Sequence, residues 1–204
     1  MAFYRDWLFP RLLDLVMQQK QMTRFREQVG QAAEGRVLDV GIGSGLNLPF
    51  YGSRASRVFG VDPSVPLLQL AKQRVNETNV PVELVPGSAE ALPFDARDMD
   101  TAVVTFTLCS VENAAASLAE IRRVLKPGGK LLFAEHGRAP DARVARWQDR
   151  LTPAWKWIAG GCHLNRKMDD LLTASGFRID ALTNPRLPGP RTHAYLYEGR
   201  ARPS

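Results

Sequence analysis

A predicted strand that runs straight into alternating glycines is the feature that most constrains the fold of this chain. Residues 36–40 form a short strand-like run, and Gly41, Gly43 and Gly45 follow directly. Glycine is needed where the backbone turns tightly and a ligand must approach it without a Cβ in the way. A dinucleotide fingerprint would place a glycine at Leu46, and a phosphate loop would end in Gly-Lys-Ser/Thr, which is absent here. We therefore expect a different ligand at this turn.

Short apolar runs alternate with amphipathic ones along the rest of the chain. Strands are predicted at residues 36–40, 57–61, 82–85, 101–106, 130–134, 177–182 and 192–197. Helices are predicted in the N-terminal segment up to residue 31, directly after Ser64 as a cap, and at residues 114–125, 144–158 and 167–174. A breaker at 126–129 ends the helix at 114–125. This alternation predicts an α/β fold with a mostly parallel sheet and helices on both faces. Such sheets bind ligands beyond the carboxyl ends of their strands.

The composition fits one globular domain of 204 residues. Hydrophobic residues make up 45% and charged residues 24%, which excludes a disordered or fibrous chain. The two cysteines, Cys109 and Cys162, have no metal-type spacing and cannot form a disulfide framework. We therefore expect no bound metal and a reduced, cytoplasmic setting.

The net charge of +6 would suit binding to nucleic acid, binding to an anionic membrane surface, or solubility alone. The positive residues are scattered rather than clustered, so we interpret them mainly as solvated helix faces.

Apolar residues recur at helical spacing in the N-terminal segment, between residues 3 and 16. Charged residues and Pro10 interrupt them, so no apolar run approaches the ~20 residues that a membrane span needs, and a signal peptide is not predicted. We expect a helix that packs on the domain, closes over a site as a lid, or lies in a membrane interface.

Two aspartates accompany the glycine turn. Asp39 lies two residues before the first glycine, where it is placed either to face a cationic ligand group or to cap the turn. Asp62 ends the second predicted strand, just before Pro63. A carboxylate there can accept hydrogen bonds from both hydroxyls of a ribose, as it does in dinucleotide-binding folds.

Four motifs together resemble the class I S-adenosylmethionine (SAM)-dependent methyltransferases, in particular the methyltransferase type 11 branch. These motifs are residues 37–45, Asp62, residues 87–94 and residues 124–129, in the family's order. The resemblance implies a Rossmann-like seven-stranded sheet whose last strand is antiparallel. It also implies a single domain, with an N-terminal helical lid at residues 1–31, a SAM-binding core at 36–135 and acceptor-side helices and final strands at 140–204.

The resemblance also assigns residues to SAM, whose product is S-adenosylhomocysteine. The glycines would surround the methionine end of SAM, and Asp39 would face its ammonium group. The backbone around Thr105 would help bind the methionine part. Asp62 would hold the ribose, and Ser88 and Ala89 would meet the adenine edge. The full predicted set is Asp39, Gly41, Gly43, Gly45, Asn47, Asp62, Pro63, Ser88, Ala89, Glu90, Thr105 and Phe106.

A narrower resemblance is to the alkyl thiol methyltransferases of the methyltransferase-like seven group. Residues 107–111, 135–136, 147–148, 153–155 and 161–166 carry it. It implies a thiol acceptor, and a thiol with a pKa near ~8.5 is already partly ionised at neutral pH. His136 and His163 are candidate bases or orienting groups, or else structural residues, whereas His193 is predicted to be structural within the last strand.

Other residues near these motifs have open interpretations. Cys109 and Cys162 are predicted to be small buried hydrophobes rather than reactive thiols. Six aromatic residues are predicted either to wall a lipophilic acceptor pocket or to belong to the core. They are Tyr4, Trp7, Phe106, Trp147, Trp155 and Trp157.

We predict a SAM-dependent methyltransferase that acts on a small lipophilic acceptor, with a thiol as first choice. One alternative is a phosphatidylethanolamine N-methyltransferase, with a peripheral membrane contact through the N-terminal helix. A quinone or aromatic methyltransferase is another, and a non-catalytic SAM-binding protein is a third. Nucleic acid is not the expected substrate, because residues 105–109 match neither an amino-methylating nor a cytosine-methylating motif.

Overall fold

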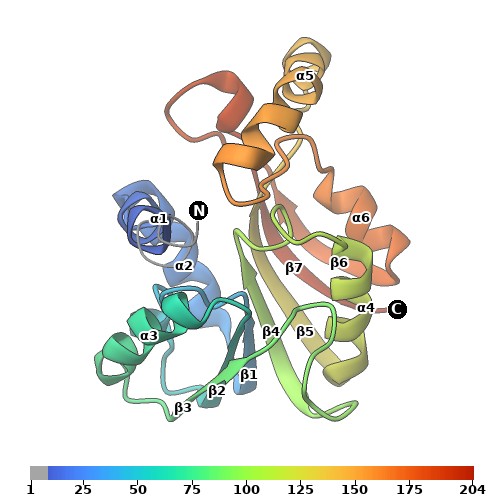
Figure 1. Cartoon of the computed structure of the whole chain (residues 1–204). Coiled ribbons are helices and arrows are strands. Elements are labelled where there is room, and N and C mark those ends of the chain that lie inside the picture. The colour runs from blue at the N-terminus through green and yellow to red at the C-terminus, as the bar shows by residue number, and fades with distance from the viewer. Residues whose placement is uncertain (1–8) are drawn as a thin grey trace.

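The computed structural model describes residues 9–204, which contain one seven-stranded sheet (Figure 1). The strands are β1 (Gly35–Val40), β2 (Ala55–Asp62), β3 (Val82–Pro86), β4 (Met99–Thr105), β5 (Leu125–His136), β6 (Phe177–Thr183) and β7 (Leu196–Pro203). Their order is β3-β2-β1-β4-β5-β7-β6. β7 runs antiparallel to both β5 and β6, whereas the other neighbouring pairs are parallel. The predicted fold class is confirmed.

Helices cover both faces because the strands bury side chains on both. The helices are α1 (Phe9–Met17), α2 (Lys20–Ala32), α3 (Val65–Arg74), α4 (Ala114–Val124), α5 (Ala142–Ile158) and α6 (Met168–Ala174). Successive strand residues point to opposite faces. Val37 packs in the core with Phe25 of α2 and Leu68 of α3. Leu38 packs in the core with Leu118 of α4 and Leu172 of α6.

Side-chain caps start three of the helices, which fixes where the chain leaves the sheet. Ser64 Oγ accepts a hydrogen bond from Leu67 N at 3.4 Å, as the sequence predicted for α3. Asn113 caps α4 and Asp141 caps α5 in the same way. No helix among residues 9–204 is long and apolar enough to cross a membrane.

The last strand was predicted wrongly, at residues 192–197. β7 begins only at Leu196 and continues to Pro203, and Arg191–His193 form a 3-10 helix instead. Proline has no backbone N–H to donate to a sheet, and Pro185, Pro188 and Pro190 crowd the preceding segment. The polar residues of β7 are strand-forming because the strand pairs with β5 on one side and β6 on the other.

The fifth strand is also longer than the predicted 130–134. β5 starts at Leu125, immediately after α4, and the predicted breaker at 126–129 belongs to it. Leu125 pairs with Met99, and the next paired residues are Lys130 and Thr101, so the register shifts here. The Pro-Gly-Gly run therefore makes an irregularity at the strand's start rather than a separate turn.

Candidate active site

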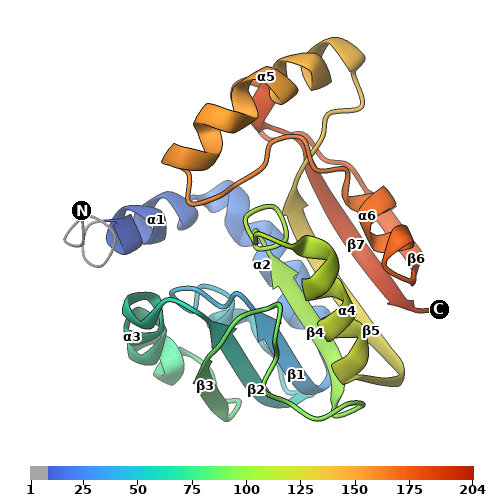
Figure 2. The same ribbon diagram turned by 45° about the vertical axis from the view of Figure 1, so that its right-hand side comes forward.

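A cavity of about 490 Å³ opens at the carboxyl ends of β1, β2 and β4. Most of the predicted cofactor residues line it: Gly41, Gly43, Asp62, Pro63, Ser88, Ala89, Glu90, Thr105 and Phe106. The N-terminal helix α1 and the residues just after α5 complete its wall (Figure 2). Gly45 and Asn47 pack behind the lining, and so does Asp39. These residues share one cavity because the carboxyl ends of parallel strands meet at one edge of a sheet.

The glycines of the turn are needed for different reasons. Gly41, Gly43 and Gly45 have φ angles of 70°, 57° and 82°, in the left-handed region that favours glycine. A Cβ on Gly41 would overlap the Thr107 side chain. A Cβ on Gly43 would meet only the Gly41 carbonyl oxygen, at 3.9 Å, so Gly43 faces open space on the cavity side.

Replacing Gly43 with valine is therefore expected to block the site while leaving the protein folded. The added side chain enters the cavity, and we expect SAM binding to weaken by about 100-fold, or ~3 kcal/mol. The left-handed φ adds a strain of about 1–2 kcal/mol to folding. Calorimetric titration with SAM and thermal unfolding measure the two effects. Gly43→Ala is the smaller control, and a folded Gly43→Val protein with unchanged SAM affinity would contradict the assignment.

Asp62 is held in a fixed orientation at the end of β2. Its Oδ2 accepts a hydrogen bond from Gly43 N at 3.0 Å, and its Oδ1 accepts one from Ser64 N at 2.8 Å. Burial raises the pKa of this carboxyl, although the two amides act against that shift. A carboxylate has about four acceptor positions, so two remain for a ligand in the cavity. This geometry suits a vicinal diol such as a ribose.

Asp39 does not line the cavity, so the predicted direct approach to an ammonium group is not what the structure shows. Its carboxylate is fully buried and accepts hydrogen bonds from Asn47 Nδ2, at 3.1 and 3.0 Å, and from Tyr51 Oη, at 2.8 Å. Burial raises its pKa to about 6. The same network includes Arg26, whose Nη1 donates to Asn47 Oδ1 at 3.0 Å and to Thr105 Oγ1 at 3.3 Å.

Arg26 is a site residue that the sequence analysis missed. It comes from α2, lines the cavity and is only 6% exposed. Its guanidinium lies 5.3 Å from the centroid of the Phe106 ring, and its Nε has no hydrogen-bond partner among the described residues. Burial lowers its pKa to about 10, which still leaves a cation at neutral pH. The signal in the sequence that could have found Arg26 is its place on the same face of the helix as the apolar residues Phe25 and Val29.

Asp14 of α1 is a second charged residue at the cavity that the sequence analysis did not predict. It forms an ion pair with Arg74 at 3.0 Å, and Arg74 in turn donates to the carbonyl of Ser44 at 2.7 Å. This chain of contacts ties α1 to the glycine turn. Leu13 and Met17 of α1 also line the cavity, so α1 forms part of its wall.

Glu135 organises the loop that follows β4. It is fully buried at the end of β5 and accepts hydrogen bonds from three backbone amides. These are Thr107 N at 2.7 Å, Leu108 N at 3.0 Å and Cys109 N at 3.0 Å. Burial raises the pKa of Glu135 to about 7, against the opposing effect of the amides. Thr107 and Ser110 of this loop line the cavity, so Glu135 shapes the site without entering it.

Comparisons with known proteins agree with this geometry. Residues 38–133 match the family described as a methyltransferase domain. A putative methyltransferase from Bacillus halodurans, 18% identical, superimposes with a TM-score of 0.70 over 89% of this chain and 96% of its own, which shows the shared fold. Human thiol S-methyltransferase TMT1A is 31% identical over 183 residues, covering 86% of this chain and 75% of that protein. This chain belongs to the class I SAM-dependent methyltransferases.

A second relative matches over a shorter part of its length. Rat thiol S-methyltransferase TMT1B is 35% identical over 149 residues, which is 71% of this chain. The overlap is 61% of the rat protein, so this methyltransferase spans less than two thirds of that relative.

The two candidate catalytic histidines do not line the cavity of this methyltransferase. His163 donates its backbone N–H to Cys109 O at 2.7 Å, and its Nδ1 is 3.1 Å from the same oxygen. Burial lowers the pKa of His163. His136 Nδ1 lies 3.7 Å from Cys162 Sγ. The structure thus brings both histidines to the cysteines behind the loop, and not to the place where a substrate would sit.

Among the aromatic residues predicted to wall an acceptor pocket or to belong to the core, Phe106 lines the cavity, whereas Trp147, Trp155 and Trp157 do not. Trp147 and Trp157 are 55% and 87% exposed, and Trp155 stacks edge-on against His193 with ring centroids 4.3 Å apart. Tyr4 and Trp7 lie outside the described residues. His193 is structural as predicted, although it lies in the 3-10 helix and not in the last strand.

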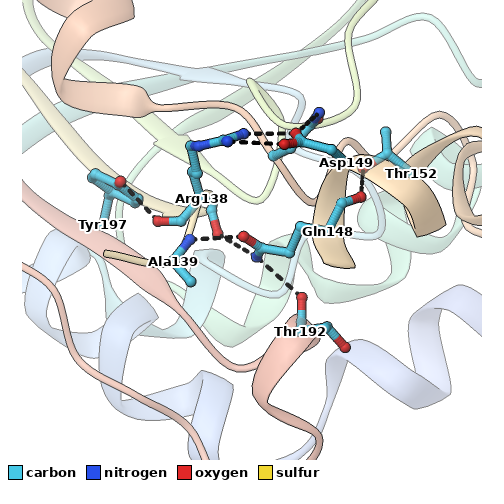
Figure 3. Close-up of polar contacts among 9 residues, drawn as sticks. Arg138, Ala139, Gln148, Asp149, Thr152, Thr192 and Tyr197 are labelled. Carbon is cyan, nitrogen blue, oxygen red and sulfur yellow. Dashed lines mark hydrogen bonds and ion pairs between the residues drawn. The ribbon is translucent and has the colours of Figure 1, made fainter. Parts of the chain in front are cut away.

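α5 is anchored at one end, while the residues after its other end border the cavity. Figure 3 shows Gln148, which is fully buried and donates to the carbonyl oxygens of Gly137 and Thr192, both at 3.1 Å. It also accepts from Ala139 N at 2.8 Å, and Arg138 forms a two-pronged ion pair with Asp149 at 2.7 and 2.9 Å. The anchor fixes the start of α5, so that Ala159 and Gly160 reach the cavity.

Proposed function

We propose that this methyltransferase transfers the methyl group of SAM to a small lipophilic thiol. The observation that carries the cofactor part is Asp62, held by two amides with free acceptor positions toward a cavity of about 490 Å³. This volume falls in the range of small-molecule sites. The assignment of a thiol as the methyl acceptor rests on the similarity to the thiol S-methyltransferases TMT1A and TMT1B.

The residues of the cavity fit the parts of SAM. Asp62 would accept hydrogen bonds from the ribose hydroxyls, and the turn at Gly43 would accommodate the methionine part. Ser88, Ala89 and Glu90 would lie against the adenine. Arg26 lines the cavity as a cation and would bind the methionine carboxylate. Asp14 also lines the cavity, and in place of Asp39 it would face the ammonium group.

The mechanism we infer depends on placement more than on acid–base chemistry. Bound SAM supplies an electrophilic methyl group on a sulfonium. Residues of the Thr107–Ser110 loop and the residues just after α5 would position the acceptor against that group, and α1 would exclude water. Neither His136 nor His163 lines the cavity, so we propose them as supports of its wall and not as bases. A thiol needs little base assistance because its pKa is close to neutral.

Replacing Arg26 with glutamine is expected to weaken SAM binding by about 10-fold, because a hydrogen bond to a charged group contributes about 1.5–3 kcal/mol. Binding of 5′-methylthioadenosine, which has no carboxylate, should not change. Arg24→Gln is the matched control, since Arg24 is an exposed arginine on the same helix. Calorimetric titration with both ligands checks this, and an equal loss for the two would contradict carboxylate binding.

The acceptor assignment is tested by transfer of labelled methyl from SAM to a panel of alkyl and aryl thiols, read by mass spectrometry. We expect a saturable methyl thioether product, absent with the matching alcohols and absent in Asp62→Ala. Product on phosphatidylethanolamine or on a quinol, with none on thiols, would contradict a thiol acceptor. Intact SAM binding without transfer to any acceptor would contradict catalysis itself.

We further propose a cytoplasmic location and a peripheral membrane contact through α1. Leu12, Leu15 and Val16 lie on one face of α1 and are 46%, 67% and 52% exposed, beside the cavity. Such a face suits partial burial in a lipid interface and entry of a lipophilic acceptor. Co-sedimentation with anionic vesicles should therefore be lost in Leu15→Glu, and undiminished binding by that variant would contradict the contact.

A further inference from the structure

A cysteine pair and a histidine meet behind the loop that lines the cavity. Cys109 lies in the loop after β4, Cys162 lies in the turn between α5 and α6, and His136 ends β5. The sulfur of Cys162 is 3.7 Å from Nδ1 of His136. The backbone N–H of His163 donates to Cys109 O at 2.7 Å, which brings the two cysteine backbones side by side. Both cysteines are free thiols, Cys109 buried and Cys162 partly exposed.

We propose that Cys162 is a reactive thiol that exchanges with small disulfides, and that Cys109 then resolves the mixed disulfide. Cys162 is partly exposed, whereas Cys109 is only 2% exposed, so a disulfide from solution reaches Cys162 first. The imidazole of His136 stands next to the Cys162 sulfur and can take its proton. His136 Nε2 has no hydrogen-bond partner within residues 9–204, and the polar contact of this ring is the one from Nδ1 to Cys162.

The electrostatics of the pair agree with this division of roles. The Cys109 thiol, followed by the neighbouring His136, lowers the pKa of Cys162. The contact with Cys162 and burial raise the pKa of Cys109 far above that of a free thiol. The thiolate is the nucleophile in disulfide exchange, so Cys162 attacks first while Cys109 remains protonated.

The exchange balances in two steps. The Cys162 thiolate, whose proton His136 has taken, attacks one sulfur of a small disulfide, and the S–S bond breaks. One half leaves as a thiolate and receives the proton back from His136 to become a small thiol, while the other half stays on Cys162. The Cys109 thiol then attacks the Cys162 sulfur, which forms the Cys109–Cys162 disulfide, and the second small thiol leaves with the Cys109 proton. The two cysteines are oxidised by two electrons in all, and one small disulfide is reduced to two thiols.

The product would join two segments that border the cavity. Ser110 and Val111 follow Cys109, Ala159 and Gly160 precede Cys162, and all four line the cavity. A disulfide between the cysteines would therefore fix the loop after β4 against the turn after α5. This inference stands on the cysteine geometry and does not depend on a thiol being the methyl acceptor.

The test treats the full-length reduced protein with excess glutathione disulfide and follows the intact mass. Wild type is expected to show a short-lived glutathione adduct that converts to a species lacking two hydrogens. Cys109→Ser should accumulate a stable adduct on Cys162, Cys162→Ser should form none on the same timescale, and His136→Asn should slow adduct formation about tenfold. SAM binding by each variant checks folding, with Cys109→Ala as the second choice at the buried position.

Several results would overturn the proposal. One is a wild-type protein whose thiols resist glutathione disulfide when folded but react in denaturant. Another is a wild-type adduct as stable as that of Cys109→Ser, since Cys109 would then not resolve it. Modification of Cys109 in Cys162→Ser at the wild-type rate would equally remove the role of Cys162.

Discussion

Asp62→Ala is expected to weaken SAM binding by more than about 100-fold. Two ribose hydroxyls would lose a charged acceptor, and each such hydrogen bond contributes about 1.5–3 kcal/mol, so the pair contributes at least ~3 kcal/mol. In the wild type, the bonds from Gly43 N and Ser64 N to Asp62 also position the glycine turn and the start of α3. The same substitution removes both bonds. Loss of ligand contacts and loss of turn geometry therefore act in the same direction.

Calorimetric titration of SAM into Asp62→Ala measures this effect, with thermal unfolding to confirm the fold. Asp62→Asn is the matched control, because it keeps one acceptor oxygen and the size of the side chain. We expect its affinity to lie between those of wild type and Asp62→Ala. An Asp62→Ala protein with near-wild-type affinity would show that the ribose is held elsewhere and would remove the main support for the proposed site.

Glu135→Ala is expected to reduce the free energy of unfolding by about 3 kcal/mol. Three backbone amides lose their acceptor, and a buried donor left without a partner costs about 1–3 kcal/mol. The amides of Leu108 and Cys109 belong to buried residues that water does not reach readily. Removal of a buried carboxylate offsets part of this loss, because burying a charged group is itself unfavourable.

Urea unfolding of wild type, Glu135→Ala and Glu135→Gln checks this result. The amide of glutamine has one acceptor oxygen, so it can replace Oε1 or Oε2 but not both, and its stability should be intermediate. Because the loop also carries Thr107 and Ser110, methyl transfer should fall even where the variants remain folded. Wild-type stability of Glu135→Ala would show that the loop has other sufficient supports, such as the bond from Arg166 Nη2 to the carbonyl of Val111 at 2.7 Å.

The sequence by itself determined the parallel core of the sheet, the glycine turn and the position of Asp62. Each of these depends on residues close together in the chain, where periodicity and glycine placement express local physics directly. Gly41 and Gly43 can be recognised from their spacing, and Asp62 from its place at the end of an apolar run. The rule that ligands bind at the carboxyl ends of parallel strands then brings them together.

Only the tertiary structure decided which charges reach the cavity. Arg26 contacts Thr105, 79 residues away, and Glu135 holds amides 26 to 28 residues distant, so no local pattern announces either role. Asp39 and the two histidines were predicted from their places in motifs, but Asp39 is fully buried and the histidines contact Cys162 and Cys109 instead of lining the cavity. The bounds of β7 likewise followed from its two partner strands. Burial and pairing between distant segments set these outcomes, and they exist only once the chain has folded.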